Sequence, residues 1–184
     1  KLTQETEIVH GVHSTHVTSF DLVPPIHMTS TFKFKDADHG ADLFSGRGTG
    51  FIYTRIGNPT IDLLEKKIAL LEGGESAVAT ASGMAAVAGA ALTLTAPGDN
   101  FIACSTLYGG TFALFNNDLA RLNIHARFIP PRMSSAREEI AGKIDSGTRF
   151  LYIETPANPT LDIIDIPLWA DIARRHGLPL IVDN

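Results

Sequence analysis

Short apolar runs alternate with stretches of helical periodicity from residue 58 onward. The runs are NFIACS, IHARFI, RFLYIET and LPLIVDN, and a weaker one, ESAVATA, precedes them. Each run is bounded by turn-forming residues, a pattern typical of strands that are buried on both faces. We therefore predict strands over residues 75–81, 100–105, 124–129, 149–155 and 178–184.

Helices are predicted between these strands. In NPTIDLLEKKIALLEGG, Asn58 suits the N-cap, Pro59 suits the first helical position and Gly73 suits the end of the helix. Apolar residues between them recur at helical spacing and define one face. Four further helices are predicted over residues 82–96, 108–122, 134–144 and 164–177.

The alternation of strand and helix indicates an α/β fold, in which a mostly parallel sheet is covered by helices on both faces. Distinctive residues follow four strands at their carboxyl ends, namely Ser82–Met84, Thr106–Gly109, Glu154–Asn158 and Asp183. Ligands of open α/β sheets bind at that edge. The sequence therefore predicts one binding site built from these four segments.

Residues 1–50 lack a sustained period. DLVPPIHMTSTFKF contains two adjacent prolines and FSGRGTGF contains three glycines. Because the segment also carries several apolar residues, we predict an irregular arm that packs on another surface. His10, His13 and His16 lie close together without any helix signal, and we predict no metal site there.

Three segments at the strand ends carry candidate chemistry. The amides of Gly83 and Met84, together with the helix dipole, suit a phosphate, although Ser82 is also suited to a plain N-cap role. Tyr108 suits stacking on a planar ring, or a half-buried place in a loop. Asp183 ends an apolar strand, where a carboxylate needs a cation or donors such as a protonated ring nitrogen, unless it caps a following helix.

Tyr53 and Arg55 are the remaining candidates. In an extended chain their hydroxyl and guanidinium groups lie on one side, where they suit a phosphate. The alternative is a surface tyrosine beside a solvated arginine. Cys104 lies within an apolar strand and is expected to be a small core residue.

Composition narrows the class of protein. The 184 residues carry a net charge of −5, which gives no support to nucleic-acid binding, and no apolar run is long enough to span a membrane. The one cysteine excludes an internal disulfide framework and favours a reducing compartment, so we expect a cytoplasmic protein. The glycine-rich fingerprints of nucleotide-binding folds are missing after the first strand.

Taken in order, YTRIGNPT, LEGGESAVATASGMAA, PGDNFIACSTLYGGTFALF, YIETPANPT and HGLPLIVDN resemble the trans-sulfuration family of pyridoxal-phosphate enzymes. The resemblance covers residues 20–184 and implies a fold-type I PLP-dependent transferase with pyridoxal 5′-phosphate as cofactor. It implies that residues 1–50 form an arm contacting a neighbouring subunit. Residues 51–184 would then be the first part of the cofactor-binding large domain.

The resemblance also implies roles for the candidate residues. The Gly83 and Met84 amides bind the cofactor phosphate, and Tyr108 stacks on the pyridine ring and contacts the substrate. Asn158 lies near the cofactor 3-oxygen and the substrate carboxylate, and Asp183 pairs with the pyridine nitrogen. Tyr108 and Asp183 are accordingly the expected catalytic residues.

Assembly and completeness follow from the same resemblance. Tyr53 and Arg55 are expected to reach the phosphate in a neighbouring subunit's site, within a homotetramer that is a dimer of dimers with shared active sites. None of the lysines, such as Lys66, Lys67 or Lys143, lies in the S-x-T-K segment that carries the family's Schiff-base lysine. We therefore expect that this lysine segment and the C-terminal domain are absent, and that the chain alone is inactive.

The individual activity depends on finer signals. LYGGT is typical of the sulfhydrylases and γ-synthases, and Gly110 stands where methionine γ-lyases usually carry cysteine. This favours γ-replacement on an acyl-homoserine by sulfide or another sulfur donor, as in an O-acetylhomoserine sulfhydrylase that makes homocysteine for methionine biosynthesis. Methionine γ-lyase and cystathionine γ-synthase stay open. A nucleotide-binding oxidoreductase and a non-catalytic binding or assembly module are the rival classes.

Overall fold

The computed structural model describes residues 3–12, 23–130 and 137–184. The chain divides into two compact units, unit 1 over residues 1–79 and unit 2 over residues 80–184. Each unit is described by itself. Within the described ranges, no helix is both long and apolar enough to cross a membrane.

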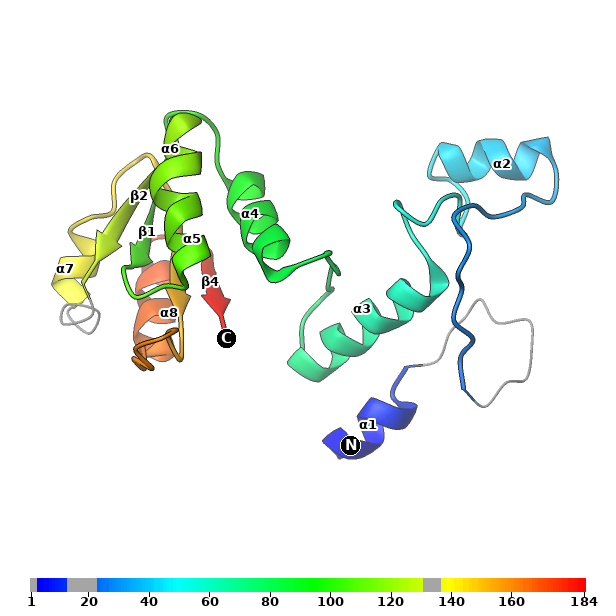
Figure 1. Ribbon diagram of the computed structural model, residues 1–184, viewed down its shortest axis with the longest axis horizontal. Coiled ribbons are helices and arrows are strands. Elements are labelled where there is room, and N and C mark those ends of the chain that lie inside the picture. Colours follow the sequence, from blue (N-terminus) through cyan, green and yellow to red (C-terminus); the bar gives the residue numbers. More distant parts are fainter. Residues whose placement is uncertain (1–2, 13–22, 131–136) are drawn as a thin grey trace. The chain divides into compact units, whose positions relative to one another are not determined.

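Unit 2 is built around a four-stranded sheet (Figure 1). Its strands are β1 (Asn100–Cys104), β2 (His125–Ile129), β3 (Thr148–Glu154) and β4 (Leu180–Asp183), in the order β2-β1-β3-β4. Every neighbouring pair is parallel. The predicted parallel sheet is therefore confirmed, and all four carboxyl ends lie at the same edge.

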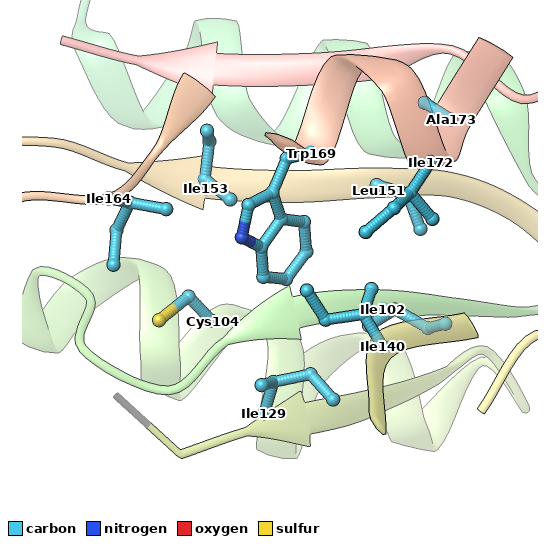
Figure 2. Packing of buried hydrophobic residues seen from close by; sticks show 10 residues of the cluster. All are labelled: Ile102, Cys104, Ile129, Ile140, Leu151, Ile153, Ile164, Trp169, Ile172 and Ala173. Carbon is cyan, nitrogen blue, oxygen red and sulfur yellow. The ribbon is translucent and has the colours of Figure 1, made fainter. Parts of the chain in front are cut away.

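One face of the sheet packs against α7 (Arg137–Ala141) and α8 (Ile166–Arg175). Figure 2 shows the indole of Trp169 lying between α8 and the strands, surrounded by aliphatic side chains of both layers. The strands contribute alternate residues to this cluster, among them Ile102 and Cys104 of β1 and Leu151 and Ile153 of β3. Cys104 is thus a buried core residue, as predicted.

The opposite face packs against α4 (Gly83–Leu94) and a helical run made of α5 (Gly109–Ala113), the π-helical turn η1 (Leu114–Asp118) and α6 (Leu119–Arg121). Its core is aromatic. The rings of Phe101 and Phe150 stack with centroids 4.4 Å apart, and Phe115 meets the edge of Tyr152 at 4.9 Å. Both faces are therefore covered by helices, as the alternating pattern predicted.

Local signals explain where the helices begin and end. Asp165 caps α8 by accepting a hydrogen bond from the Leu168 amide at 2.9 Å. The last turn of α8 carries Arg174 and Arg175, whose positive charges interact favourably with the negative end of the helix dipole. Asp171 of α8 pairs with Arg137 of α7 at 2.6 Å, which ties the two helices together over the same face of the sheet.

Unit 1 contains α1 (Gln4–His10), α2 (Ala37–Phe44) and α3 (Pro59–Glu72). α3 starts and ends as predicted, with Asn58 at the N-cap and Gly73 in the left-handed conformation after it, at φ 64°. Residues 1–50 are less irregular than predicted, because Thr3 and Asp36 cap α1 and α2. His13 and His16 lie outside the described residues.

The strand predicted over residues 75–81 is wrong. The segment makes no strand pairing with any described residue, and Val78 is 82% exposed. An extended segment becomes a strand only when another backbone supplies its hydrogen bonds. Here the Ala79 amide instead donates to the Glu65 carboxylate at 2.8 Å. Its apolar pattern alone could not reveal that no described backbone pairs with it.

Candidate active site

A pocket of about 450 Å³ lies in unit 2 at the carboxyl ends of the strands. It gathers the four segments that the sequence pointed to, and five of the seven predicted site residues line it, namely Gly83, Met84, Tyr108, Asn158 and Asp183. The remaining lining residues are Ser82, Val87, Thr111, Glu154, Pro156 and Asn184. The sheet edge therefore does form one site.

The start of α4 provides the pocket with free backbone donors. Ser82 is the N-cap, and its hydroxyl accepts a hydrogen bond from the Ala85 amide at 3.1 Å. The amides of Gly83 and Met84 donate to no other described residue, as expected for the first turn of a helix. A Cβ added at Gly83 would have nothing within 4 Å, so the space beside this residue is open.

Tyr108 lies between β1 and α5 and is half exposed. Its ring occupies the space above Gly110, where a Cβ would stand only 2.7 Å from the Tyr108 Cε1 atom and 3.2 Å from the Met84 sulfur. Any side chain at position 110 would therefore force the ring to move. The glycine that distinguished the LYGGT motif in the sequence thus has a direct steric function.

Asp183 ends β4 next to Tyr152 of β3. The Tyr152 hydroxyl donates to Asp183 Oδ2 at 2.8 Å, while Oδ1 accepts no hydrogen bond from the described residues. Burial raises the pKa of Tyr152 far above its ordinary value, and the nearby Asp183 carboxylate adds to the shift. The phenol consequently stays protonated and remains a donor, which fixes one oxygen of Asp183 and leaves the other available.

Glu154 ends β3 and is buried, with 6% of its surface exposed. Its Oε2 atom accepts the Tyr108 amide at 2.7 Å, and its Oε1 atom accepts the Asn158 amide at 2.9 Å. The Asn158 residue itself is exposed and follows the cis peptide bond before Pro156. Glu154 therefore joins the two loops that carry Tyr108 and Asn158.

Tyr53 and Arg55 belong to unit 1, where they line a separate pocket with residues 27–30 and Thr54. The prediction for these two residues assumed an extended chain, but the chain turns at this point. Tyr53 bridges Thr31, and the chain then turns, with the Ile56 and Gly57 amides both donating to the Tyr53 carbonyl. The Arg55 guanidinium carbon lies 5.6 Å from the centre of the Tyr53 ring, a cation–π contact.

Thr111 and Tyr152 were not predicted to belong to this site. Glu154 was predicted only as part of a segment at a strand end, and Gly110 only as a mark of the individual activity. Each of these four residues contacts or supports a pocket residue. A signal existed for Glu154, because it is a carboxylate that ends an apolar strand, the same pattern that drew attention to Asp183. Tyr152 lacked a signal of this kind, since an aromatic residue in a buried strand is usually only core.

These groups suit a planar, phosphorylated, basic ring. Two free amides at a helix start bind phosphate, an aromatic side chain stacks on a ring, and a carboxylate with one open oxygen pairs with a protonated nitrogen. The open space at Gly83 and the unpaired oxygen of Asp183 leave room for such a group. The residues present therefore fit pyridoxal 5′-phosphate.

Comparison with known proteins supports this fit. The family model described as "Cys/Met metabolism PLP-dependent enzyme" matches residues 5–184. The chain is 43% identical over 180 residues to O-acetyl-L-homoserine sulfhydrylase 1 of Thermus thermophilus, covering 98% of this chain and 42% of that protein. It is 40% identical over 180 residues to L-methionine gamma-lyase of Pseudomonas deceptionensis, covering 97% of this chain and 44% of that protein.

The fold is shared with a solved relative as well. A putative O-acetylhomoserine (thiol)-lyase from Campylobacter jejuni, solved with N′-pyridoxyl-lysine-5′-monophosphate, superimposes with a TM-score of 0.91 at 32% identity. The superposition covers all of this chain and 45% of that one. The chain thus spans less than half the length of the relatives it matches.

Proposed function

Because the chain belongs to the family of Cys/Met metabolism PLP-dependent enzymes, we propose that the full-length protein carries out γ-replacement on an activated homoserine. The substrate is an acyl-homoserine, the incoming group is sulfide or another sulfur donor, and the product is homocysteine. Pyridoxal 5′-phosphate is the cofactor of this family. When bound, it withdraws electrons from the α-carbon of the amino acid that is joined to it.

The pocket residues act on the cofactor from different sides. The Gly83 and Met84 amides bind its phosphate at the start of α4, where the helix dipole favours negative charge. The Tyr108 ring would stack on the pyridine ring, and Asn158 would serve the 3-oxygen and the substrate carboxylate. The open oxygen of Asp183 holds the proton on the pyridine nitrogen, which makes the ring a stronger electron acceptor.

The observation that favours replacement is the contact between Gly110 and Tyr108. The Tyr108 ring lies where any side chain at position 110 would stand, so this pocket suits a glycine there. The LYGGT motif is typical of sulfhydrylases and γ-synthases, whereas methionine γ-lyases usually carry cysteine at this position. The relatives include several named as sulfhydrylase or homocysteine synthase, at 39% to 43% identity.

The second candidate is γ-elimination from methionine. It is supported by relatives named L-methionine gamma-lyase, at 40% and 39% identity over nearly the whole chain. Steady-state assays of the full-length protein separate the two. Acetyl-, succinyl- and phosphohomoserine are each supplied with sulfide, and methionine is supplied alone. Faster turnover of methionine than of every ester would overturn the proposal.

A glycine pair tests the contact on which the assignment depends. Gly110→Ala should displace the Tyr108 ring and lower turnover with the best ester, because the new methyl group would overlap that ring. Gly109→Ala is the matched control, since a Cβ there meets nothing within 4 Å. Equal activity of the two variants would remove the steric argument.

The protein is proposed to be a cytoplasmic homotetramer whose active sites are shared between subunits. Tyr53 and Arg55 would bind the cofactor phosphate of a neighbouring subunit, which accounts for a hydroxyl and a guanidinium gathered at one exposed turn. Co-expression of an Arg55→Ala subunit with an Asp183→Ala subunit, both full length, provides the test. Hybrids that regain activity support sharing, and confirmed hybrids no more active than their parents argue for sites built within one chain.

A further inference from the structure

Glu154 has an unusual place among the pocket residues, because both of its oxygens are engaged by backbone amides of two different loops. The Tyr108 amide belongs to the loop between β1 and α5, and the Asn158 amide belongs to the loop after β3. The first of these contacts spans 46 positions of the chain. A single carboxylate therefore connects two separate walls of the pocket.

These two hydrogen bonds give each oxygen of the Glu154 carboxylate a backbone donor. Among the residues that the structure describes, no lysine, arginine or histidine forms an ion pair with Glu154. A buried charge is costly unless donors surround it, and here the donors are the two loop amides. Residues of the same loops, Tyr108 and Asn158, are the ones proposed above to face the cofactor ring.

We propose that Glu154 is a positioning residue that holds the Tyr108 and Asn158 loops at the separation the cofactor ring requires. The inference rests on the proposed function for its consequence, but not for the contacts themselves. A carboxylate is needed because it accepts at both oxygens. An amide of the same size would accept at one oxygen only, and its NH₂ group would face the other loop's amide.

The first experiment examines the loops without the cofactor. Glu154→Gln is made in the full-length protein, and hydrogen exchange of the apo form is followed in peptides covering residues 105–112 and 155–162. At least one of the two loops should exchange about 10- to 100-fold faster, the loss expected for one hydrogen bond to a charged group. Glu139→Gln, an exposed glutamate on α7, is the matched control and should exchange like the wild type.

The second experiment measures the consequence for the cofactor. The dissociation constant for pyridoxal 5′-phosphate should rise about 10- to 100-fold in Glu154→Gln, and the visible circular dichroism of the bound cofactor should change. In a Tyr108→Ala, Asn158→Ala background the same substitution should weaken cofactor binding much less, because Glu154 acts through those residues. Full additivity would mean that Glu154 acts directly or only through the stability of the fold.

The possible results distinguish a failure of the positioning role of Glu154 from a failure of the proposed function. Unchanged exchange in both loops of a folded Glu154→Gln protein overturns the positioning role, and so does faster exchange with unaltered cofactor affinity. If that variant does not fold, Glu154→Asp replaces it, since the shorter carboxylate keeps the charge but cannot reach both amides. If the wild type binds no pyridoxal 5′-phosphate, the proposed function fails, whereas the exchange experiment still tests whether Glu154 holds the loops.

Discussion

The two units of this chain differ in the interactions that stabilise each of them internally. In unit 2, aromatic and aliphatic side chains on both faces of the sheet are almost fully buried. In unit 1, Leu43 is the one buried aliphatic or aromatic side chain among the described residues, proline aside, and the apolar face of α3 is open, with Leu64 52% exposed. The hydrophobic effect therefore stabilises unit 2 far more than unit 1.

Unit 1 relies on polar contacts to a greater degree. Asn58 is buried and makes three of them, accepting from the Thr60 amide and donating to the His27 carbonyl and the Thr54 hydroxyl. These contacts connect the start of α3 to the segment around residue 27. The comparison teaches that a clear helical pattern, as in α3, predicts a helix without predicting that its apolar face is covered.

The largest expected effect comes from the core of unit 2. Trp169→Ala removes a fully buried indole from between α8 and the sheet and should lower the free energy of unfolding by about 3–5 kcal/mol. Denaturant unfolding of the full-length protein, followed by circular dichroism, measures it. Ile166→Ala, a partly exposed change on the same helix, is the control and should cost far less.

The next effect concerns the polar contacts of unit 1. Asn58→Ala removes the cap of α3 and both side-chain donors, and should cost about 2 kcal/mol. Asn58→Asp keeps the capping oxygen but loses the donors, so its cost should be intermediate. Hydrogen exchange of peptides from α3 gives the local measurement. If Asn58→Ala leaves exchange in α3 unchanged, unit 1 does not depend on these contacts.

A smaller effect tests the buried phenol of unit 2. Tyr152→Phe keeps the ring but removes the donor to Asp183, at a cost of about 1 kcal/mol near neutral pH. The pKa of Tyr152 is raised in the folded protein, so its contribution is complete below the pKa of an unfolded tyrosine, about 10. Above that pH the wild type should lose stability more steeply than the variant. Parallel unfolding curves across this pH range would contradict the buried, protonated phenol.

The smallest effect lies at the surface of unit 2. Hydrogen bonding to Arg137, with Arg175 nearby, lowers the pKa of Asp171. A lowered carboxyl pKa contributes stability above the unfolded value of about 3.9, and the contribution is lost as pH falls further. Asp171→Asn should therefore lower stability slightly at neutral pH, and its stability should approach that of the wild type in acid, so that its pH curve is flatter. A variant as acid-sensitive as the wild type would show that the ion pairs contribute nothing.

Most of unit 2 was predictable from the sequence because its signals are local. The strands β1 to β4, the parallel sheet and the helices on both faces all follow from apolar runs and caps. The strand predicted over residues 75–81 failed because strand formation needs a partner, which a run of apolar residues does not identify. The helices α1 and α2 were missed because each is a short element set by a single cap.

The site divides in a similar way. Gly83, Met84, Tyr108, Asn158 and Asp183 were predicted because they follow strands in sequence, and parallel strands bring their ends together. Glu154 and Tyr152 act through contacts with residues 46 and 31 positions away. Such contacts depend on register between strands, which a single sequence does not specify.

Successive side chains of β3 point alternately into the two cores, so the strand does not tolerate the loss or gain of a single residue. Leu151 and Ile153 belong to one core, whereas Phe150 and Tyr152 belong to the other. Deleting a single residue at the start of the strand would exchange the two sets and turn the Glu154 carboxylate away from its loops. Length variation during evolution should therefore be confined to connecting segments, while β3 changes only by substitution.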